Sequence, residues 1–385
     1  MNREELLLVG LGGAGNKVVD TIVDTDMRFP AYFINSAKTD IESLNNYDNI
    51  DKNYFCISNQ NGTGRDRNLG KAFAQKKGMN MLDILLRHDE KTLFFVTSLG
   101  GGSGSSIISV LLNGISRIKE DPDMDFDKTI NLICILPSLD SPDVVLQNAI
   151  DTWNEIMSYN CVNSMMFIDN NTMSNGNLLD EDSINQIFAE EFTALFDIPS
   201  TNGRNFDNGN LRKLINSKGC IYIYDLPSGC ESIQEALSVA ERNSVVSRMY
   251  KSDQILDKTN GLERIQCSCL GTSFNDESYS HDELNISYKA NDNFDGFNEE
   301  HNLLLLSGAM PPKTAIDLIE KELTNRENTI NVNMDFNKFK VSNTTKNNVQ
   351  NKKGANNLFK NPKTNDKDKM MKKALKRKKN LFDIL

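Results

Sequence analysis

A glycine-rich stretch between a strand-like run and a helix-like run constrains this chain most. The stretch is Ser98–Ser106, which reads Ser-Leu-Gly-Gly-Gly-Ser-Gly-Ser-Ser. Thr92–Thr97 before it is apolar, as buried strands are, and apolar residues recur at helical spacing across Ile107–Ile118 after it. Glycines let a backbone approach a ligand closely, and a helix N-terminus offers unpaired N–H groups, so this unit favours anion binding. A lone loop of this kind is equally compatible with a flexible turn.

A second unit of the same kind opens the chain. A strand predicted at Glu5–Val9 leads into Gly10-Leu11-Gly12-Gly13-Ala14-Gly15-Asn16, and a helix is predicted from about Lys17. The Gly-x-Gly-x-x-Gly spacing also occurs in dinucleotide-binding turns, which place an acidic residue about 20 residues further on. The second strand, Ala31–Ile34, ends instead in Asn35-Ser36-Ala37-Lys38, and no Walker P-loop sequence occurs. A nicotinamide-dependent dehydrogenase is therefore a disfavoured alternative.

Strands and helices alternate through the first half of the chain. Further strands are predicted at Tyr54–Ile57, Thr129–Leu136 and Ser164–Ile168, each followed by a polar loop. This alternation predicts a doubly wound, mainly parallel α/β sheet, whose ligand lies outside the carboxyl ends of the strands.

The second half begins with a long helix. Its apolar stripe spans Asp182–Phe196, and Asp182 or Ser183 is expected to cap its start. A helix at Leu211–Ile215, a helix across Ser232–Tyr250 and a last helix opened by Pro312 follow. Three further strands, predicted at Cys220–Tyr224, Arg264–Leu270 and Leu303–Leu306, indicate a second, smaller α+β domain.

The charge is divided between the body and the C-terminal segment. Residues 337–385 hold 15 Lys/Arg and three Asp/Glu, a net charge of +12, which leaves 28 basic and 50 acidic residues elsewhere, a net −22. We expect a flexible, disordered basic tail that ends in an amphipathic helix over Lys367–Leu385. Such a helix binds a partner's groove, DNA phosphates or an anionic membrane, and the alternative is a solvated tail.

The composition excludes several classes of protein. No apolar run reaches the roughly 20 residues that cross a bilayer, so no membrane span is expected. The seven cysteines are scattered, which favours reduced thiols in the cytoplasm over disulfides. The three histidines stand far apart, and no metal-ligand cluster is predicted.

The two glycine loops together resemble those of the tubulin/FtsZ superfamily. The family's Gly-Gly-Gly-Thr-Gly-Ser-Gly is matched by Gly100–Ser106, with serine in place of the threonine and of the last glycine, and its Gly-Gly-Gly-Gly-Asn by Gly12–Asn16. The resemblance covers roughly residues 5–330. It is closest to the TubZ branch of plasmid and phage DNA partition, because the motifs are eroded and the C-terminus lacks the acidic, proline-containing peptide of cell-division FtsZ.

The resemblance implies a division of the chain into parts. These are a GTP-binding domain (1–181), a central connecting helix (182–198), a second, activation domain (199–312), a C-terminal helix (313–336) and the flexible basic tail (337–385).

The resemblance also assigns the nucleotide site. The residues implied for the phosphates are Gly12, Gly13, Ala14, Gly15, Asn16, Gly62, Thr63, Gly64, Gly100, Gly101, Gly102, Ser103, Gly104 and Ser105. Asn170 and Asn185 fall where the family reads guanine, and an amide can both accept from and donate to that base. Asn35, Asp140 and Asp143 are further candidates for contacts with the ribose and base.

The catalytic loop is implied in the same way. The family's Asn-x-Asp-x-x-Asp enters the next subunit's nucleotide pocket, and here the corresponding residues are Asn205, Asp207 and Asn210. Asn210 replaces the last acid, so hydrolysis is expected to depend on Asp207 or to be slow. The family's strand-five arginine is also missing, with Val145 at that position.

The implied protein is a tubulin-like GTPase that polymerises head to tail into filaments for plasmid or phage DNA segregation, using GTP/GDP and Mg²⁺. Its tail would engage a DNA-bound helix-turn-helix adaptor resembling TubR, so that contact with DNA is indirect, or direct where its lysines reach the phosphates. The alternatives are an FtsZ-like cell-division filament and a nucleotide-binding scaffold that does not hydrolyse.

Overall fold

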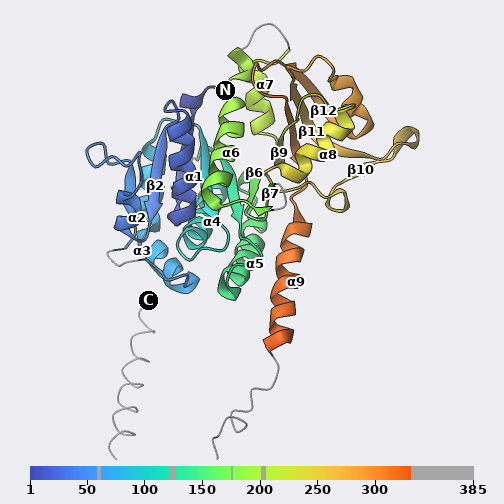
Figure 1. The fold of residues 1–385 in the computed structure, drawn as a ribbon. Helices are drawn as coiled ribbons and strands as arrows, with labels where there is room; N and C mark the ends of the chain where they lie inside the picture. The colour runs from blue at the N-terminus through green and yellow to red at the C-terminus, as the bar shows by residue number, and fades with distance from the viewer. Residues whose placement is uncertain (59–61, 122, 124–125, 175–176, 201–204, 331–385) are drawn as a thin grey trace, which may run out of the picture. The chain divides into compact units, whose positions relative to one another are not determined.

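An eleven-stranded mixed sheet organises the residues that the computed structural model describes, which are 1–58, 62–121, 123, 126–174, 177–200 and 205–330 (Figure 1). Its strands are β1 (Leu6–Leu11), β2 (Ala31–Asn35), β3 (Tyr54–Cys56), β4 (Thr92–Ser98), β5 (Thr129–Leu136), β6 (Val162–Asp169), β9 (Gly219–Asp225), β10 (Leu256–Asp257), β11 (Arg264–Ser273), β12 (Tyr288–Gly296) and β13 (Leu303–Ala309). They lie in the order β10-β11-β13-β9-β6-β5-β4-β1-β2-β3, and β12 pairs with β11. A separate hairpin joins β7 (Met173–Ser174) to β8 (Asn177–Leu178).

The strands β1 to β6 are parallel to their neighbours, and they match the strands predicted for the first half of the chain. All six residues of β1 are buried, as expected for a parallel strand covered on both faces. The predicted α/β class with a mainly parallel sheet is confirmed.

Helices cover both faces of the sheet. They are α1 (Gly12–Thr25), α2 (Lys38–Glu42), α3 (Arg67–Arg87), α4 (Gly104–Glu120), α5 (Asp143–Met157), α6 (Glu181–Ala194), α7 (Asn208–Ile215), α8 (Ile233–Asn243) and α9 (Lys313–Ile330). The helices α1 and α6 contact each other in front of the sheet (Figure 1), while α3 contacts α4, α4 contacts α5, and α5 contacts α9. Because β1 connects toward β2 and β4 toward β5, the strand order reverses between β1 and β4, which is where doubly wound sheets bind ligands.

The starts of α1 and α6 differ from the predicted ones. The helix α1 begins at Gly12 rather than near Lys17, because a φ of +73° at this glycine turns the chain directly from strand into helix. The helix α6 is capped by Asp180, one turn before Ser183, whose N–H its carboxylate accepts at 2.8 Å.

The predicted helix across Ser232–Tyr250 was too long. The helix α8 ends at Asn243, and the chain beyond it runs extended beside β6. There Ser247 N donates to Phe167 O at 2.7 Å, and Asp169 N donates to Val245 O at 2.8 Å. Pairing with the sheet therefore overrides the helical spacing of the apolar residues.

The sheet continues across the predicted boundary between two domains. The strands β6 and β9 share two register pairs, Ser164 with Gly219 and Met165 with Cys220, and β9 then pairs with antiparallel β13. The domain limits stay a prediction.

The basic tail (337–385) and the end of the predicted C-terminal helix lie outside the described residues. No described helix combines the length and the apolar character needed to cross a membrane.

Candidate functional site

The two glycine loops touch each other at the reversal point of the sheet. A Cβ on Gly12 would lie 2.6 Å from Gly104 N, and a Cβ on Gly104 would lie 2.4 Å from Leu11 O. These separations are shorter than any normal carbon contact, so only glycine allows the first turns of α1 and α4 to begin side by side. Two helix N-termini therefore converge on one place, where their free N–H groups can hold an anion.

The first turn of α1 is also fixed against the sheet. A Cβ on Gly15 would lie only 2.0 Å from Val96 O of β4, whereas Gly13 has open space around it. Asn16 is buried, and its Oδ1 accepts no hydrogen bond from the described residues. A buried amide oxygen without a donor fits a site that a polar ligand completes.

Three loops meet through their hydroxyl groups. Ser103 Oγ lies 2.6 Å from Ser36 Oγ and 3.3 Å from Thr63 Oγ1, which joins the loops after β2, β3 and β4. Sequence reasoning had selected Ser103 and Thr63 but not Ser36. The position of Ser36 directly after the second strand was the signal that could have identified it.

A buried arginine holds these loops from behind. Arg67, at the start of α3, donates to Ser105 Oγ at 3.3 Å and to Ser109 Oγ at 2.9 Å, and pairs with Glu155 of α5 at 2.6 Å. Partial burial opposes the charge of Glu155, but hydrogen bonds from Arg67 and Lys71 outweigh it and lower the pKa of Glu155 to about 2. No local pattern predicts this network, because Arg67 and Glu155 are far apart along the chain.

The residues expected to read a base lie at the same edge of the sheet. Asn170 directly follows β6, and Asn185 is buried on α6. Neither side chain has a hydrogen-bond partner among the described residues, so both amides remain available for a ligand. The neighbouring Asn171, which sequence reasoning missed, holds the loop after β5 instead, accepting from Leu139 N at 2.7 Å and donating to Pro137 O at 3.1 Å.

The other candidates for ribose and base contacts differ in their surroundings. The side chain of Asn35 is buried and used within its own loop, accepting from Ser36 N at 2.7 Å and donating to Asp40 at 3.2 Å. Asp143 pairs with Arg326 of α9 at 3.1 Å, while Asp140 is exposed.

The three residues expected to be catalytic form one turn at the start of α7. The Asp207 carboxylate caps the helix by accepting from Asn210 N at 2.8 Å, and Asn210 Nδ2 donates to Asn205 O at 2.8 Å. We call Asn205–Asn210 the α7 turn. Asp207 is exposed and is its only acidic residue.

The α7 turn lies at the opposite edge of the sheet from the glycine loops. The amino group of Met1 donates to Asn208 O, and Arg212 pairs with Glu5 at 2.5 Å, so the turn is attached where β1 begins (Figure 1). The glycine loops lie where β1 ends, and six residues of strand span about 20 Å. The chain therefore does not bring Asp207 to its own glycine loops.

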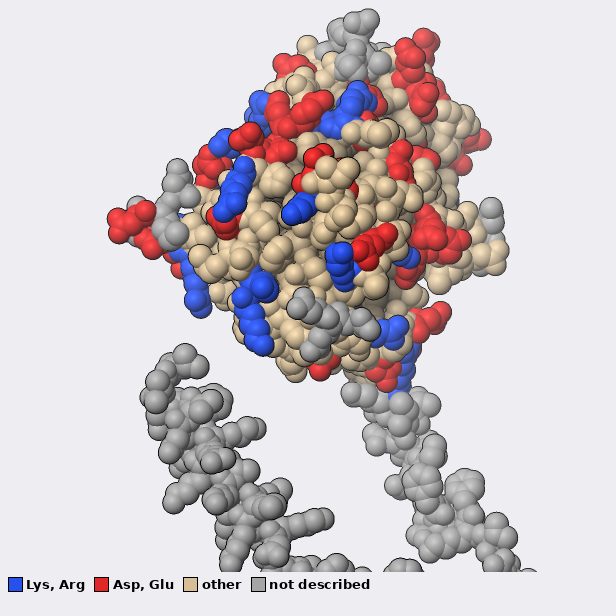
Figure 2. Space-filling view, turned by 90° about the vertical axis from the view of Figure 1, so that its left-hand side faces the viewer, with Lys and Arg blue, Asp and Glu red and all other residues tan. Residues whose placement is uncertain are grey.

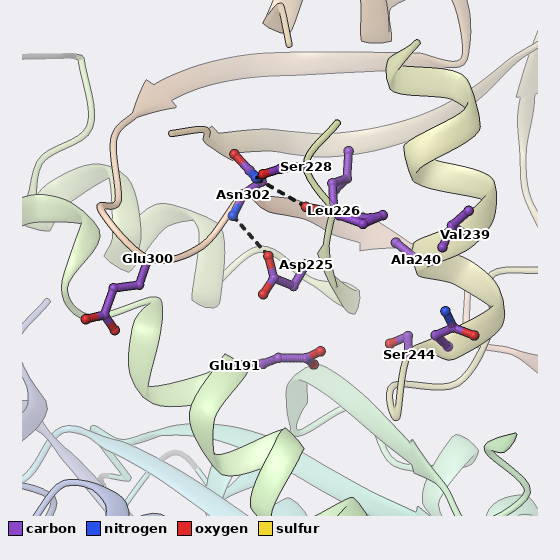
Figure 3. Close-up of a pocket in the computed structure, with 11 residues that line it drawn as sticks. Glu191, Asp225, Leu226, Ser228, Val239, Ala240, Ser244, Glu300 and Asn302 are labelled. Carbon is purple, nitrogen blue, oxygen red and sulfur yellow. Dashed lines mark hydrogen bonds between the residues drawn. The ribbon is translucent and has the colours of Figure 1, made fainter. Parts of the chain in front are cut away.

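A cavity of about 370 Å³ lies between α6, the end of β9 and α8, and contains none of the predicted site residues (Figure 3). Glu191 of α6 points its carboxylate into it, below Asp225 (Figure 3). Glu191 is 7% exposed, and its Oε2 has no hydrogen-bond partner among the described residues. Burial, with smaller contributions from Asp225 and Glu190, raises the pKa of Glu191 to about 8.

Glu191→Gln is expected to stabilise the fold, and more so as the pH rises toward 8. The folded state keeps the Glu191 proton up to a pKa of about 8, whereas an unfolded glutamate loses it above 4.5. Between these values the wild-type protein loses about 1.4 kcal/mol of stability per pH unit at this residue, and glutamine, which does not titrate, removes that loss. Urea unfolding at about pH 6 and about pH 8 measures the difference. The exposed Glu181→Gln, on the same helix, is the control. A stabilisation by Glu191→Gln that is independent of pH would contradict the assignment.

Comparisons with known proteins agree with this geometry. Residues 5–177 match the model of the GTPase domain of the Tubulin/FtsZ family. The chain is 23% identical over 325 residues to the tubulin-like protein TubZ of a Clostridium botulinum C phage, covering 83% of each protein. The crystal structure of TubZ from Clostridium botulinum phage c-st superposes with a TM-score of 0.71 at 21% identity, covering 85% of this chain and 99% of that one. A GTPγS-bound protofilament structure of CetZ2 from Haloferax volcanii superposes with a TM-score of 0.63 at 18% identity, covering 85% of this chain and 100% of that one.

Proposed function

Residues 5–177 of this chain are a GTPase domain of the tubulin/FtsZ family, and on this premise we propose that the protein polymerises head to tail and hydrolyses GTP between subunits. The observation that carries the proposal is the position of the α7 turn. Asp207 lies at the amino edge of the sheet and the glycine loops at its carboxyl edge. The α7 turn of one subunit therefore completes the nucleotide site of another, and a contact between two different surfaces extends into an open filament.

The geometry also supports the choice of nucleotide. The converging N-termini of α1 and α4 suit the phosphates. The amides of Asn170 and Asn185, which have no hydrogen-bond partner in the part of the chain that the structure describes, are available for guanine. Each amide can accept from guanine N1–H or N2–H and donate to guanine O6, and an amide left unmatched by the base is costly where it is buried. Mg²⁺ is expected to accompany the triphosphate and to be held largely by its oxygens and water.

We propose that the filaments move DNA, as the similarity to a phage TubZ suggests. On the face drawn in Figure 2, acidic and basic side chains of the described residues are interspersed, and no continuous basic patch is visible there. The concentrated positive charge of this chain lies in residues 337–385. This basic tail is the segment suited to engage DNA carried by a helix-turn-helix adaptor.

Light scattering after addition of GTP or ATP tests the assembly, with phosphate release followed in parallel. We expect a rise with GTP alone, above a critical concentration, accompanied by phosphate release that increases more steeply than linearly with protein. Scattering without phosphate release would favour a non-hydrolysing scaffold, in which Asn210 in place of an acidic residue has abolished GTP hydrolysis. A protein that responds to neither nucleotide would refute the proposed function.

Deletion of residues 337–385 is expected to leave GTP-dependent assembly intact and to reduce binding of adaptor-coated DNA at least about tenfold. The deletion removes a net charge of +12. Contacts between basic side chains and DNA phosphates depend on this charge and weaken steeply as the salt concentration rises. Cosedimentation of labelled adaptor–DNA complex with filaments measures this, and unchanged cosedimentation would remove the tail from the mechanism. A variant with the tail lysines changed to arginine, which keeps the charge, is the control.

A further inference from the structure

The last described helix reaches the loop between β5 and α5. Arg326 of α9 donates through Nη1 to Ser141 O at 2.7 Å and through Nη2 to Leu139 O. Nη1 also meets Asp143 Oδ1 at 3.1 Å, and Glu322, one turn earlier on α9, accepts from Nε at 2.8 Å. A planar guanidinium that bonds two carbonyls and a carboxylate at once restrains that loop in a way a point charge does not.

The helix that follows this loop holds one of the glycine loops. A Cβ on Gly100 would lie 2.5 Å from Val145 Cγ1, so the first turn of α5 packs directly on this glycine. Asn148 Nδ2 donates to Gly100 O at 3.2 Å, and Thr152 Oγ1 donates to Leu99 O at 2.9 Å. A shift of the start of α5 therefore moves the backbone that leads into α4.

These contacts form a continuous path from α9 to the glycine loop. Its steps are Arg326 to the β5–α5 loop, that loop to the first turns of α5, and α5 to Leu99 and Gly100. Each step is a hydrogen bond to backbone or a direct packing contact, so a change at one end has a physical route to the other.

We propose that Arg326 is a positioning residue of the nucleotide site, which sets the glycine loop at Gly100 through α5. The inference rests on the proposed function in one respect, namely that the ligand of this loop is a nucleotide. Coupling between two sites is reciprocal, so nucleotide binding also tightens the docking of α9. The basic segment follows α9 in the chain, and a partner that pulls on it acts on nucleotide affinity.

Hydrogen exchange of the full-length protein without nucleotide tests the path directly. The reporters are three amides, those of Leu139, Val145 and Leu99, which donate to Asn171 Oδ1, Pro142 O and Ile135 O. Arg326→Gln is expected to speed their exchange about tenfold or more, the factor for a lost charge-assisted hydrogen bond, while β1 stays unchanged. Lys321→Gln, at an exposed position of α9, is the matched control and is expected to change none of them. Faster exchange confined to α9 would overturn the proposal.

The second measurement separates positioning from a general loss of stability. Arg326→Gln is expected to raise the KM for GTP about tenfold with kcat within about twofold, because the loop is misplaced but the α7 turn is intact. Arg326→Lys keeps the positive charge but lacks the planar guanidinium. Its KM for GTP is expected to lie between those of the wild-type protein and Arg326→Gln. An unchanged KM in Arg326→Gln would overturn the proposal. A wild-type protein that bound no GTP would refute the proposed function instead, and the exchange experiment would still decide the coupling.

Discussion

Asp207→Asn is expected to slow GTP hydrolysis at least about 100-fold while GTP binding and assembly persist. Asp207 is the only acid of the α7 turn, so no neighbouring carboxylate can take the proton of the attacking water. Loss of a positioned general base typically costs a factor of about 10²–10⁴. Asparagine is a helix cap as good as aspartate and can still accept from Asn210 N, so α7 stays folded. Phosphate release at a protein concentration that supports assembly measures the effect.

Asn210→Asp provides the converse test. It adds a second carboxylate to the α7 turn and removes the exposed hydrogen bond from Asn210 Nδ2 to Asn205 O. We expect hydrolysis to be faster than in the wild-type protein, by about tenfold, since a carboxylate accepts a proton and an amide does not. Hydrolysis at the wild-type rate in Asp207→Asn would show that the α7 turn is not the catalytic element.

Gly15→Ala is expected to destabilise the fold by about 3 kcal/mol or more and to abolish nucleotide binding. The new methyl group would lie 2.0 Å from Val96 O, a backbone atom of the central strand β4 that cannot rotate away. Overpacking costs about 1–3 kcal/mol even where side chains can adjust, and here the whole of α1 must move. Urea unfolding followed by circular dichroism measures the loss.

Gly13→Ala is the matched control for this variant. Gly13 is two residues away in the same helical turn, and nothing lies within 4 Å of a Cβ built there. Alanine is also a better helix former than glycine by about 1 kcal/mol, so stability is expected to stay level or to rise. Equal losses in the two variants would show that α1 is not pressed against β4.

Sequence reasoning located the glycine loops because their chemistry is local. Strand, glycine turn and helix follow one another within about 20 residues, and the periodicity of the flanking runs sets the element types. The α7 turn was located through the family resemblance, although the helix was predicted to begin at Leu211, after the cap that Asp207 provides. These features need no knowledge of distant parts of the chain.

The residues that hold the loops in place could not be predicted in this way. Arg67 meets Glu155, and Arg326 meets Asp143, across very long separations in the sequence, and nothing local marks them as partners. Tertiary contacts also decided the end of α8, because Val246 pairs with β6. The strand β12 was missed because its residues are largely polar, so no apolar run marked it.

The placement of the glycine loops and the α7 turn at opposite edges of one sheet gives the proposed filament two chemically different ends. One end subunit has a nucleotide that no neighbour covers, and the other presents an Asp207 with nothing to act on. A dimer therefore completes one of its two sites, and each added subunit completes one more. Turnover per subunit then starts at half its limiting value and rises with length, so the catalytic rate itself reports how long the polymers are. The uncovered terminal nucleotide stays a triphosphate, because no Asp207 reaches it.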